Sequence, residues 1–194
     1  MASTCPAQPV NPFRSGLSRL GLFDFHNLET VMIRAIGDIT FEELAKPLAI
    51  GASDLITGQR VTITDGRVAL AVHASSAVPG VVIPVRWRGS LLCDGVVSGN
   101  IPIRELREMG ADVVLAVNIM SRHRKMPSSF LWAGSNAFTQ LVIRAGDCLK
   151  SADLLIEPDL AETDYLFPDG QELIALGWAA TEPIITQLQA LLAT

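Results

Sequence analysis

The residues best suited to chemistry are an aspartate and a glycine, Asp94 and Gly95, which directly follow a short apolar segment at residues 91–93. In α/β proteins ligands bind where strands end, so a carboxylate in this position lies at the edge where a site can form. Such a carboxylate can orient a nucleophile or accept its proton. The same pattern also fits a plain Asp-Gly turn, and on these residues alone the turn is the favoured interpretation.

The histidines are weaker candidates. His26, His73 and His123 are far apart, and none has the spacing of a metal-binding pair. His73 belongs to an apolar segment at residues 68–74, where we expect a packing or surface histidine rather than a base. The sequence therefore predicts no metal site and no cofactor.

The composition fits two classes of protein. Hydrophobic residues make up 49% of the 194 residues and charged residues 18%, as in a sheet buried on both faces or in a membrane protein. No apolar run approaches the roughly 18 to 20 residues of a spanning helix, and the longest, such as residues 113–117, have strand length. The net charge is −5 and basic residues are scattered, so we expect no nucleic-acid binding. The densest basic group, residues 122–125, is predicted to be a solvated loop.

The cysteines and the N-terminal residues indicate the cellular compartment in which we expect the protein. Cys5, Cys93 and Cys148 are far apart and form no C-x-x-C pair, which favours reduced thiols and a cytoplasmic location. The first 14 residues lack the apolar core of a signal peptide. Residues 1–20 are predicted to be a disordered lead-in.

Periodicity and turn residues outline alternating helices and strands. Thr40 opens a capping-box pattern, Thr-Phe-Glu-Glu, which predicts a short helix before Pro47. Gly37 and Gly110 are expected to end helices. Helices are predicted at residues 23–37, 68–74, 103–109, 130–149 and 170–192, the last kinked at Pro183, and strands at residues 48–52, 60–64, 91–93, 113–119 and 154–157. This alternation predicts an α/β fold with a mostly parallel sheet.

Three segments together resemble a known family. The first is residues 47–55, Pro-Leu-Ala-Ile-Gly-Ala-Ser-Asp-Leu, followed by Thr57-Gly58. The second is residues 74–80, Ala-Ser-Ser-Ala-Val-Pro-Gly. The third runs from Asp94-Gly95 through Asn100-Ile101-Pro102 to Met-Gly-Ala-Asp-Val-Val at residues 109–114. In this order and spacing the segments resemble the patatin-like phospholipase family over roughly residues 21–192.

The resemblance implies a three-layer α/β fold and a serine acyl hydrolase that uses a Ser–Asp dyad without histidine. In that family the serine lies in a G-x-S-x-G nucleophile elbow, and a glycine-rich loop supplies N–H donors to the oxyanion. The catalytic aspartate belongs to a D-G-G/A motif, which corresponds here to Asp94, Gly95 and Val96. Asp94 would be the base. The third motif residue departs from the family, since Val96 is bulkier than glycine or alanine.

The chain also contains no G-x-S-x-G segment. Residues 51–55, Gly-Ala-Ser-Asp-Leu, begin like one but lack the second glycine, and they match a part of the family that follows the elbow. Ser75 and Ser76 look like a nucleophile pair, but the resemblance makes them structural. Residues 21–194 are therefore predicted to be the C-terminal portion of a patatin-like domain whose N-terminal part is missing, inactive alone.

The sequence is compatible with two alternatives. The chain could be a non-catalytic module that pairs with or regulates another chain, or a complete enzyme with a displaced serine. The expected partners are lipid acyl esters, a membrane surface, and either a chain that supplies the missing half or a second copy. The expected location is the cytoplasm, including the periphery of a membrane. Asp153 and Glu157 flank a predicted strand and are expected to have no chemical role.

Overall fold

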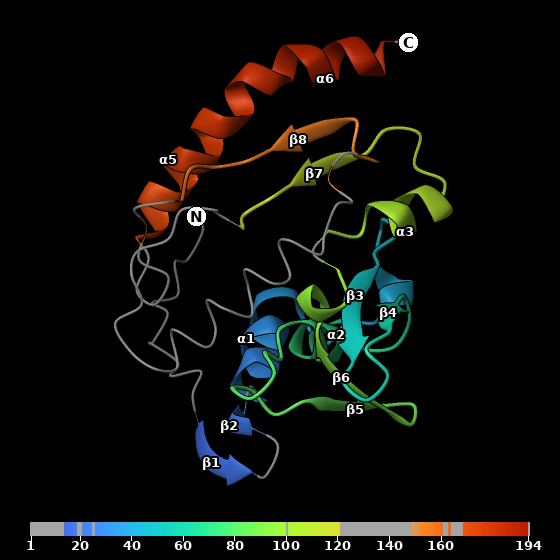
Figure 1. Ribbon diagram of the computed structural model, residues 1–194, viewed down its shortest axis with the longest axis vertical. Helices are drawn as coiled ribbons and strands as arrows, with labels where there is room; N and C mark the ends of the chain where they lie inside the picture. The colour runs from blue at the N-terminus through green and yellow to red at the C-terminus, as the bar shows by residue number, and fades with distance from the viewer. Residues whose placement is uncertain are drawn as a thin grey trace. The chain divides into compact units, whose positions relative to one another are not determined.

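The computed structural model describes residues 14–18, 21–24, 26–99, 101–120, 149, 151–160, 163 and 169–193 (Figure 1). The chain divides into two compact units, Met1–Ser98 and Gly99–Thr194, and each is described by itself. The helix predicted at residues 130–149 lies outside the described residues except for Leu149. In the part of the chain that the structure describes, no helix has the length and apolar character needed to span a bilayer.

The first unit contains a four-stranded antiparallel sheet in the order β4-β3-β6-β5. Its strands are β3 (Ile50–Asp54), β4 (Arg60–Ile63), β5 (Val85–Trp87) and β6 (Ser90–Asp94). Short turns join β3 to β4 and β5 to β6, and strands joined in this way must run antiparallel. The backbone turns back at Gly58 and Gly89, which have φ angles of +70° and +89°.

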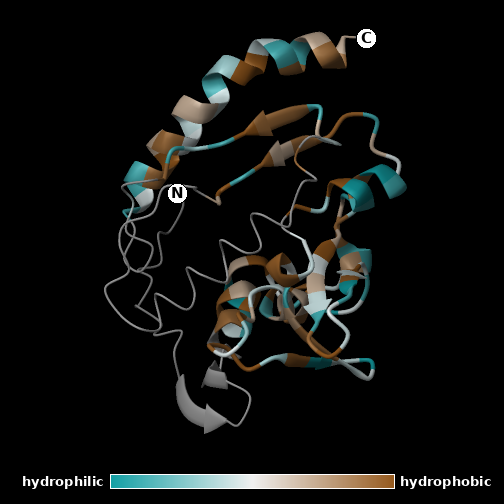
Figure 2. Cartoon of the chain, viewed as in Figure 1, coloured by the Kyte–Doolittle hydropathy of each residue, from teal (hydrophilic) through white to brown (hydrophobic). Residues whose placement is uncertain are grey.

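Helix α2 (Val68–Ser75) packs against β3 and β6. It is apolar on most sides, and in Figure 2 much of this part of the unit is brown, the colour of hydrophobic residues. The core consists of α2 residues such as Ala71, strand residues such as Ala52 and Leu92, and Phe41. Helix α1 (His26–Ile36) packs against α2 and ends at Gly37, as predicted.

The segments that precede α2 include one short helix that the sequence predicts and one hairpin that it does not. The capping-box segment forms a 3-10 helix, η1 (Phe41–Glu43), in which the Thr40 N–H donates to Glu43 Oε2 at 2.7 Å. Strands β1 (Arg14–Ser18) and β2 (Gly21–Asp24) form an antiparallel hairpin, so residues 14–18 of the expected lead-in are paired.

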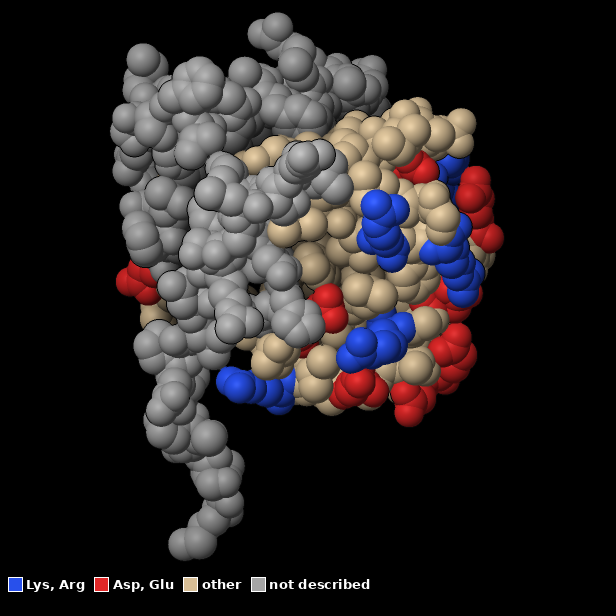
Figure 3. All heavy atoms as spheres, turned by 90° about the horizontal axis from the view of Figure 1, so that it is seen from below, with Lys and Arg blue, Asp and Glu red and all other residues tan. Residues whose placement is uncertain are grey.

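On the face shown in Figure 3, basic and acidic side chains are interspersed.

The second unit contains the parallel pairing that the sequence predicts. Strand β7 (Leu115–Val117) pairs in parallel with β8 (Leu154–Ile156), and both are shorter than their predicted ranges. Helix α3 (Ile103–Glu108) ends before Gly110, whose φ is +93°. The predicted kink at Pro183 is a 3-10 turn, η4 (Glu182–Ile184), between α5 (Gly170–Thr181) and α6 (Ile185–Leu192). The α/β class is thus confirmed, but the parallel arrangement applies to β7 and β8 and not to the four-stranded sheet.

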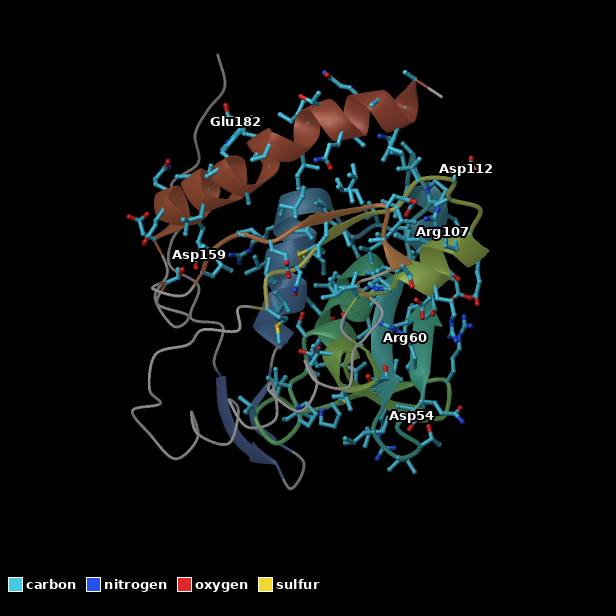
Figure 4. The ribbon with its side chains drawn as sticks, turned by 45° about the horizontal axis from the view of Figure 1, so that its top comes forward. Asp54, Arg60, Arg107, Asp112, Asp159 and Glu182 are labelled. Carbon is cyan, nitrogen blue, oxygen red and sulfur yellow. The ribbon has the colours of Figure 1, made fainter. Side chains whose placement is uncertain are left out.

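Asp153 has a structural role in the second unit. Its Oδ2 accepts hydrogen bonds from the Val114 N–H, at 2.6 Å, and from the Arg107 guanidinium. Arg107 also donates to the main-chain oxygens of Ala111 and Asp112, and Figure 4 shows Arg107 beside Asp112. The Val114 N–H and then the Arg107 guanidinium lower the pKa of Asp153. This carboxylate therefore anchors the chain that leads into β7.

Candidate active site

Asp94 is the last residue of β6 and the N-cap of a 3-10 turn, η2 (Gly95–Val97). Its Oδ1 accepts a hydrogen bond of 2.9 Å from the Val96 N–H in this turn. The Asp94 N–H donates to the Ala77 carbonyl, also at 2.9 Å. The carboxylate is thus oriented by the main chain of its own turn, as in an N-cap.

Two opposing influences act on the Asp94 carboxyl. Burial raises the pKa of Asp94, because a partly buried site disfavours the charged form, and the Val96 N–H bond lowers it to a smaller extent. A raised pKa makes a carboxylate a stronger base at neutral pH. Asp94 Oδ2 accepts no hydrogen bond from the residues that the structure describes. One carboxylate oxygen is therefore held in place while the other is available to a proton donor.

Gly95 is the position in this turn that cannot hold a side chain. A Cβ atom built there would lie 2.4 Å from the Gly51 carbonyl oxygen and 2.9 Å from the Gly51 carbonyl carbon. Both atoms belong to the main chain of β3, so they cannot move aside cheaply. Val96, in contrast, gives Asp94 only its main-chain N–H, which valine supplies as well as glycine or alanine does. The motif departure at Val96 therefore leaves this hydrogen bond intact.

The serines near Asp94 bond to the main chain and, in the case of Ser53 and Ser98, to each other. Ser53 on β3 is fully buried, and its Oγ lies 2.9 Å from the Asp94 carbonyl oxygen and 2.7 Å from Ser98 Oγ. Ser75 Oγ donates to the Gly51 carbonyl at 2.7 Å. Among the described residues, no serine hydroxyl is hydrogen-bonded to the Asp94 carboxylate. Sequence reasoning did not find the contact between Ser53 and Ser98, because it depends on the register of β3 and β6.

Other titratable groups of the first unit have structural environments. His73 on α2 is buried, and its Nδ1 lies 2.7 Å from Oε1 of Glu29 on α1, which joins the two helices. Burial, followed by the charges of Asp94 and Asp54, raises the pKa of Cys93 to about 11, so its thiol stays protonated and unreactive. His123 lies outside the described residues. In the described part of the chain, no group of three or more His, Cys, Asp or Glu residues could hold a metal ion.

Comparison with known proteins identifies the family. A family model described as patatin-like phospholipase matches residues 5–107, which is more than half of the chain. The chain therefore belongs to the patatin-like phospholipase family. The match begins inside the expected lead-in and includes Asp94, Gly95 and Val96.

The relatives are distant and longer than the matched region. Uncharacterized NTE family proteins of Mycobacterium bovis and Mycobacterium tuberculosis are 29% identical over 103 residues, which cover 53% of this chain and 29% of theirs. A protein of Yarrowia lipolytica named lysophospholipase NTE1 is 26% identical over 105 residues, 54% of this chain and 7% of its own length. The matched region is thus less than a third of each of these relatives.

The contact between Gly95 and Gly51 is testable by substitution. Gly95→Ala should lower the free energy of unfolding by about 1–3 kcal/mol, because the new Cβ collides with the β3 main chain. Gly51→Ala is the matched control: its Cβ would meet only side-chain atoms of Arg60, at the ordinary contact distance of 3.5 Å, so the change should stay within about 1 kcal/mol. Urea denaturation of both variants measures the difference. Equal stabilities would contradict the proposed steric constraint.

The raised pKa of Asp94 implies a cost to stability at neutral pH. Because folding disfavours the ionised form, this cost appears as the pH rises above the unfolded-state pKa of about 3.9. Asp94→Asn keeps the acceptor for the Val96 N–H and removes the charge, so it should raise the unfolding temperature at pH 7. The difference from the unsubstituted chain should vanish well below pH 4.

Asp54→Asn is the control of opposite sign for this experiment. Hydrogen bonds from the Ser90 hydroxyl and from the Ile56 and Thr57 N–H groups lower the pKa of Asp54. Its charge therefore stabilises the folded state at neutral pH, and Asp54→Asn should lower the unfolding temperature at pH 7. Thermal denaturation between pH 3 and pH 7 compares the two variants. The same sign for both would contradict the pKa assignments.

Proposed function

We propose that this chain supplies the catalytic base, Asp94, of a patatin-like serine acyl hydrolase that cleaves lipid esters through a Ser–Asp dyad. The nucleophilic serine and the oxyanion loop would come from a polypeptide segment that this sequence does not contain. The observation that carries the proposal is the Asp94 carboxylate: it lies at a strand end, is held by one oxygen, and has a pKa raised by burial. Perturbed carboxylates of this kind are frequent at functional sites.

In the proposed mechanism Asp94 acts in both half-reactions. Its carboxylate accepts the proton of the serine hydroxyl as the serine oxygen attacks the ester carbonyl. The resulting carboxylic acid gives the proton to the departing alkoxide, and the serine remains acylated as an acyl-enzyme. Asp94 then accepts a proton from the water that hydrolyses the acyl-enzyme, and it gives this proton back to the serine. The available oxygen, Oδ2, is suited to these transfers because Oδ1 is already bonded to Val96.

The names of the family and of its relatives support a class of substrate. The family model carries the name phospholipase, and the fungal relatives carry the name lysophospholipase. These names support phospholipid or lysophospholipid esters as the substrates. Contact with a membrane surface would be needed to reach them, and Ile174 and Trp178, one turn apart on α5, are exposed apolar side chains suited to such contact. The buried free thiol of Cys93 fits the proposed cytoplasmic location.

Activity should depend on completing the site. The 194-residue chain alone should not hydrolyse p-nitrophenyl acyl esters above background, because it offers a base without its nucleophile. Fusion to an N-terminal patatin segment that carries a G-x-S-x-G elbow should give turnover. Asp94→Asn in the fused protein should then lower kcat by about 10²–10⁴-fold, the usual contribution of a general base.

Asp54→Asn is the control for this assay. Asp54 ends the neighbouring strand β3, but the Ile56 and Thr57 N–H groups bond to its carboxylate, and Figure 4 shows it at the β3–β4 turn. This substitution should leave kcat within a few-fold of the parent. Activity of the chain alone that survives Asp94→Asn would exclude Asp94 as the base.

A second candidate function is a non-catalytic module that pairs with another chain. The observation that favours it is the apolar face of β7, where Leu115, Val117 and the following Ile119 are 39%, 51% and 61% exposed. Alternate residues of a strand point to the same side, so Leu115 and Val117 share one face of β7, and Ile119 continues the same spacing just beyond the strand. Apolar rows of this kind promote association.

Light scattering of the purified chain tests this pairing. The chain should form oligomers, and the double substitution Val117→Thr and Ile119→Thr should shift it toward the monomer. Ile56→Thr is the control, because Ile56 is 78% exposed but lies in a turn of the first unit and not on β7. A monomeric parent chain, or oligomers that survive the double substitution, would contradict a role for this face.

A further inference from the structure

The hydroxyl of Ser53 is placed beneath the turn that carries Asp94. Ser53 is 0% exposed, and its strand, β3, lies beside β6 in the sheet (Figure 1). Its Oγ lies 2.9 Å from the Asp94 carbonyl oxygen, 3.0 Å from the Ser98 nitrogen and 2.7 Å from Ser98 Oγ. One buried oxygen therefore contacts both ends of the five-residue turn from Asp94 to Ser98.

The hydrogen-bonding capacity of this hydroxyl is fully used. A serine hydroxyl has one proton to donate and two lone pairs that accept. The Asp94 carbonyl, at 2.9 Å, can only accept and is nearer to Ser53 Oγ than the Gly95 carbonyl, at 3.4 Å, so we assign the Ser53 proton to the Asp94 carbonyl. The Ser98 N–H then donates to one lone pair of Ser53 Oγ, and with this assignment the Ser98 hydroxyl is the donor to the other. This complete set of hydrogen bonds satisfies a polar side chain at a fully buried strand position.

The orientation of the Asp94 carboxylate depends on this turn. Its Oδ1 is bonded to the Val96 N–H, which lies in the middle of the turn. If the two ends of the turn separate, the Val96 N–H moves away from Oδ1 and the carboxylate gains rotational freedom. The close approach of Gly95 to the Gly51 carbonyl restricts how near the turn can come to β3, but it provides no hydrogen bond to either end of the turn.

We infer that Ser53 is a positioning residue for Asp94: its hydroxyl closes the Asp94–Ser98 turn and so directs the Asp94 carboxylate toward its proton donor. The catalytic meaning of this inference rests on the proposed function of Asp94. The geometric part, that Ser53 controls the turn, can be tested without substrate. Ser53 is thus a support for the base and not a displaced nucleophile.

The test uses the full chain labelled with 15N. In the unsubstituted protein the Val96 amide shift should follow the ionisation of Asp94, because the two groups are hydrogen-bonded. In Ser53→Ala this titration should be lost, and the Ser98 amide should exchange with solvent about two- to tenfold faster, the equivalent of one net hydrogen bond. The Ser98 N–H keeps a longer contact of 3.3 Å with the Gly95 carbonyl, which limits the acceleration.

Matched variants separate positioning from general destabilisation. Ser90→Ala removes a hydroxyl from the other end of β6, where it bonds to Asp54, and should leave the Val96 titration unchanged. Ser53→Thr restores a hydroxyl and should restore the titration. If Ser53→Ala does not fold, Ser98→Ala serves instead: it removes one of the three bonds and should weaken the Val96 titration in part.

Defined outcomes would overturn the inference. One is a Val96 amide that does not titrate with Asp94 in the unsubstituted chain. The other is a Ser53→Ala protein that melts at a lower temperature while its Val96 titration and Ser98 exchange stay unchanged, since Ser53 would then be merely structural. In the completed enzyme Ser53→Ala should lower kcat and leave KM unchanged. An activity that survives Asp94→Asn would refute the proposed function alone, because the amide measurements need no substrate.

Discussion

The close passage of β3 beneath the turn after β6 is the contact on which the geometry of the candidate site depends. The Gly51 carbonyl lies so near Gly95 that a Cβ atom would not fit between them. This approach brings Ser53, two residues along β3, within hydrogen-bond distance of the Asp94 carbonyl. The carboxylate itself is then oriented by the Val96 N–H of the same turn. The Val96 N–H and the Ser53 hydroxyl thus position Asp94. This arrangement depends on the side chain at Gly95, where a Cβ would collide, and not on the side chain at Val96.

Elements with strong local signals could be predicted from the sequence. Helices α1, α2 and α3 and strands β3, β4 and β6 formed near their predicted positions, because apolar spacing and turn glycines act over a few residues. Strand β5 was missed, since it has three residues and turns back through Arg88 at φ +48°. The direction of pairing was also wrong for the four-stranded sheet. Hydrophobic patterns report which residues are buried, whereas short connections decide that neighbours run antiparallel.

The candidate site was predictable to a similar extent. Asp94 and Gly95 stood out because an apolar segment, an aspartate and a glycine are adjacent in the sequence. Ser53 and Ser98 did not, because their contact joins residues 45 positions apart and depends on the register in which Ser53 faces Cys93. In the sequence, Val96 stood out because its side chain departs from the family motif. In the structure, the contact with Asp94 is made by the main-chain N–H of Val96, which glycine would supply equally well.

Asp54 and Asp94 help to decide between the two interpretations of the Asp-Gly segment. Each ends a strand of the same sheet, and each caps a turn with its side chain. Asp54 behaves as a turn residue should: three hydrogen bonds favour its charge and lower its pKa. Asp94 receives one such bond, and burial outweighs it and raises its pKa. An aspartate that served only to cap a turn would be stabilised by an environment like that of Asp54, which favours the charged carboxylate. The environment of Asp94 instead disfavours its charge and makes it a better base, as the proposed role in proton transfer requires.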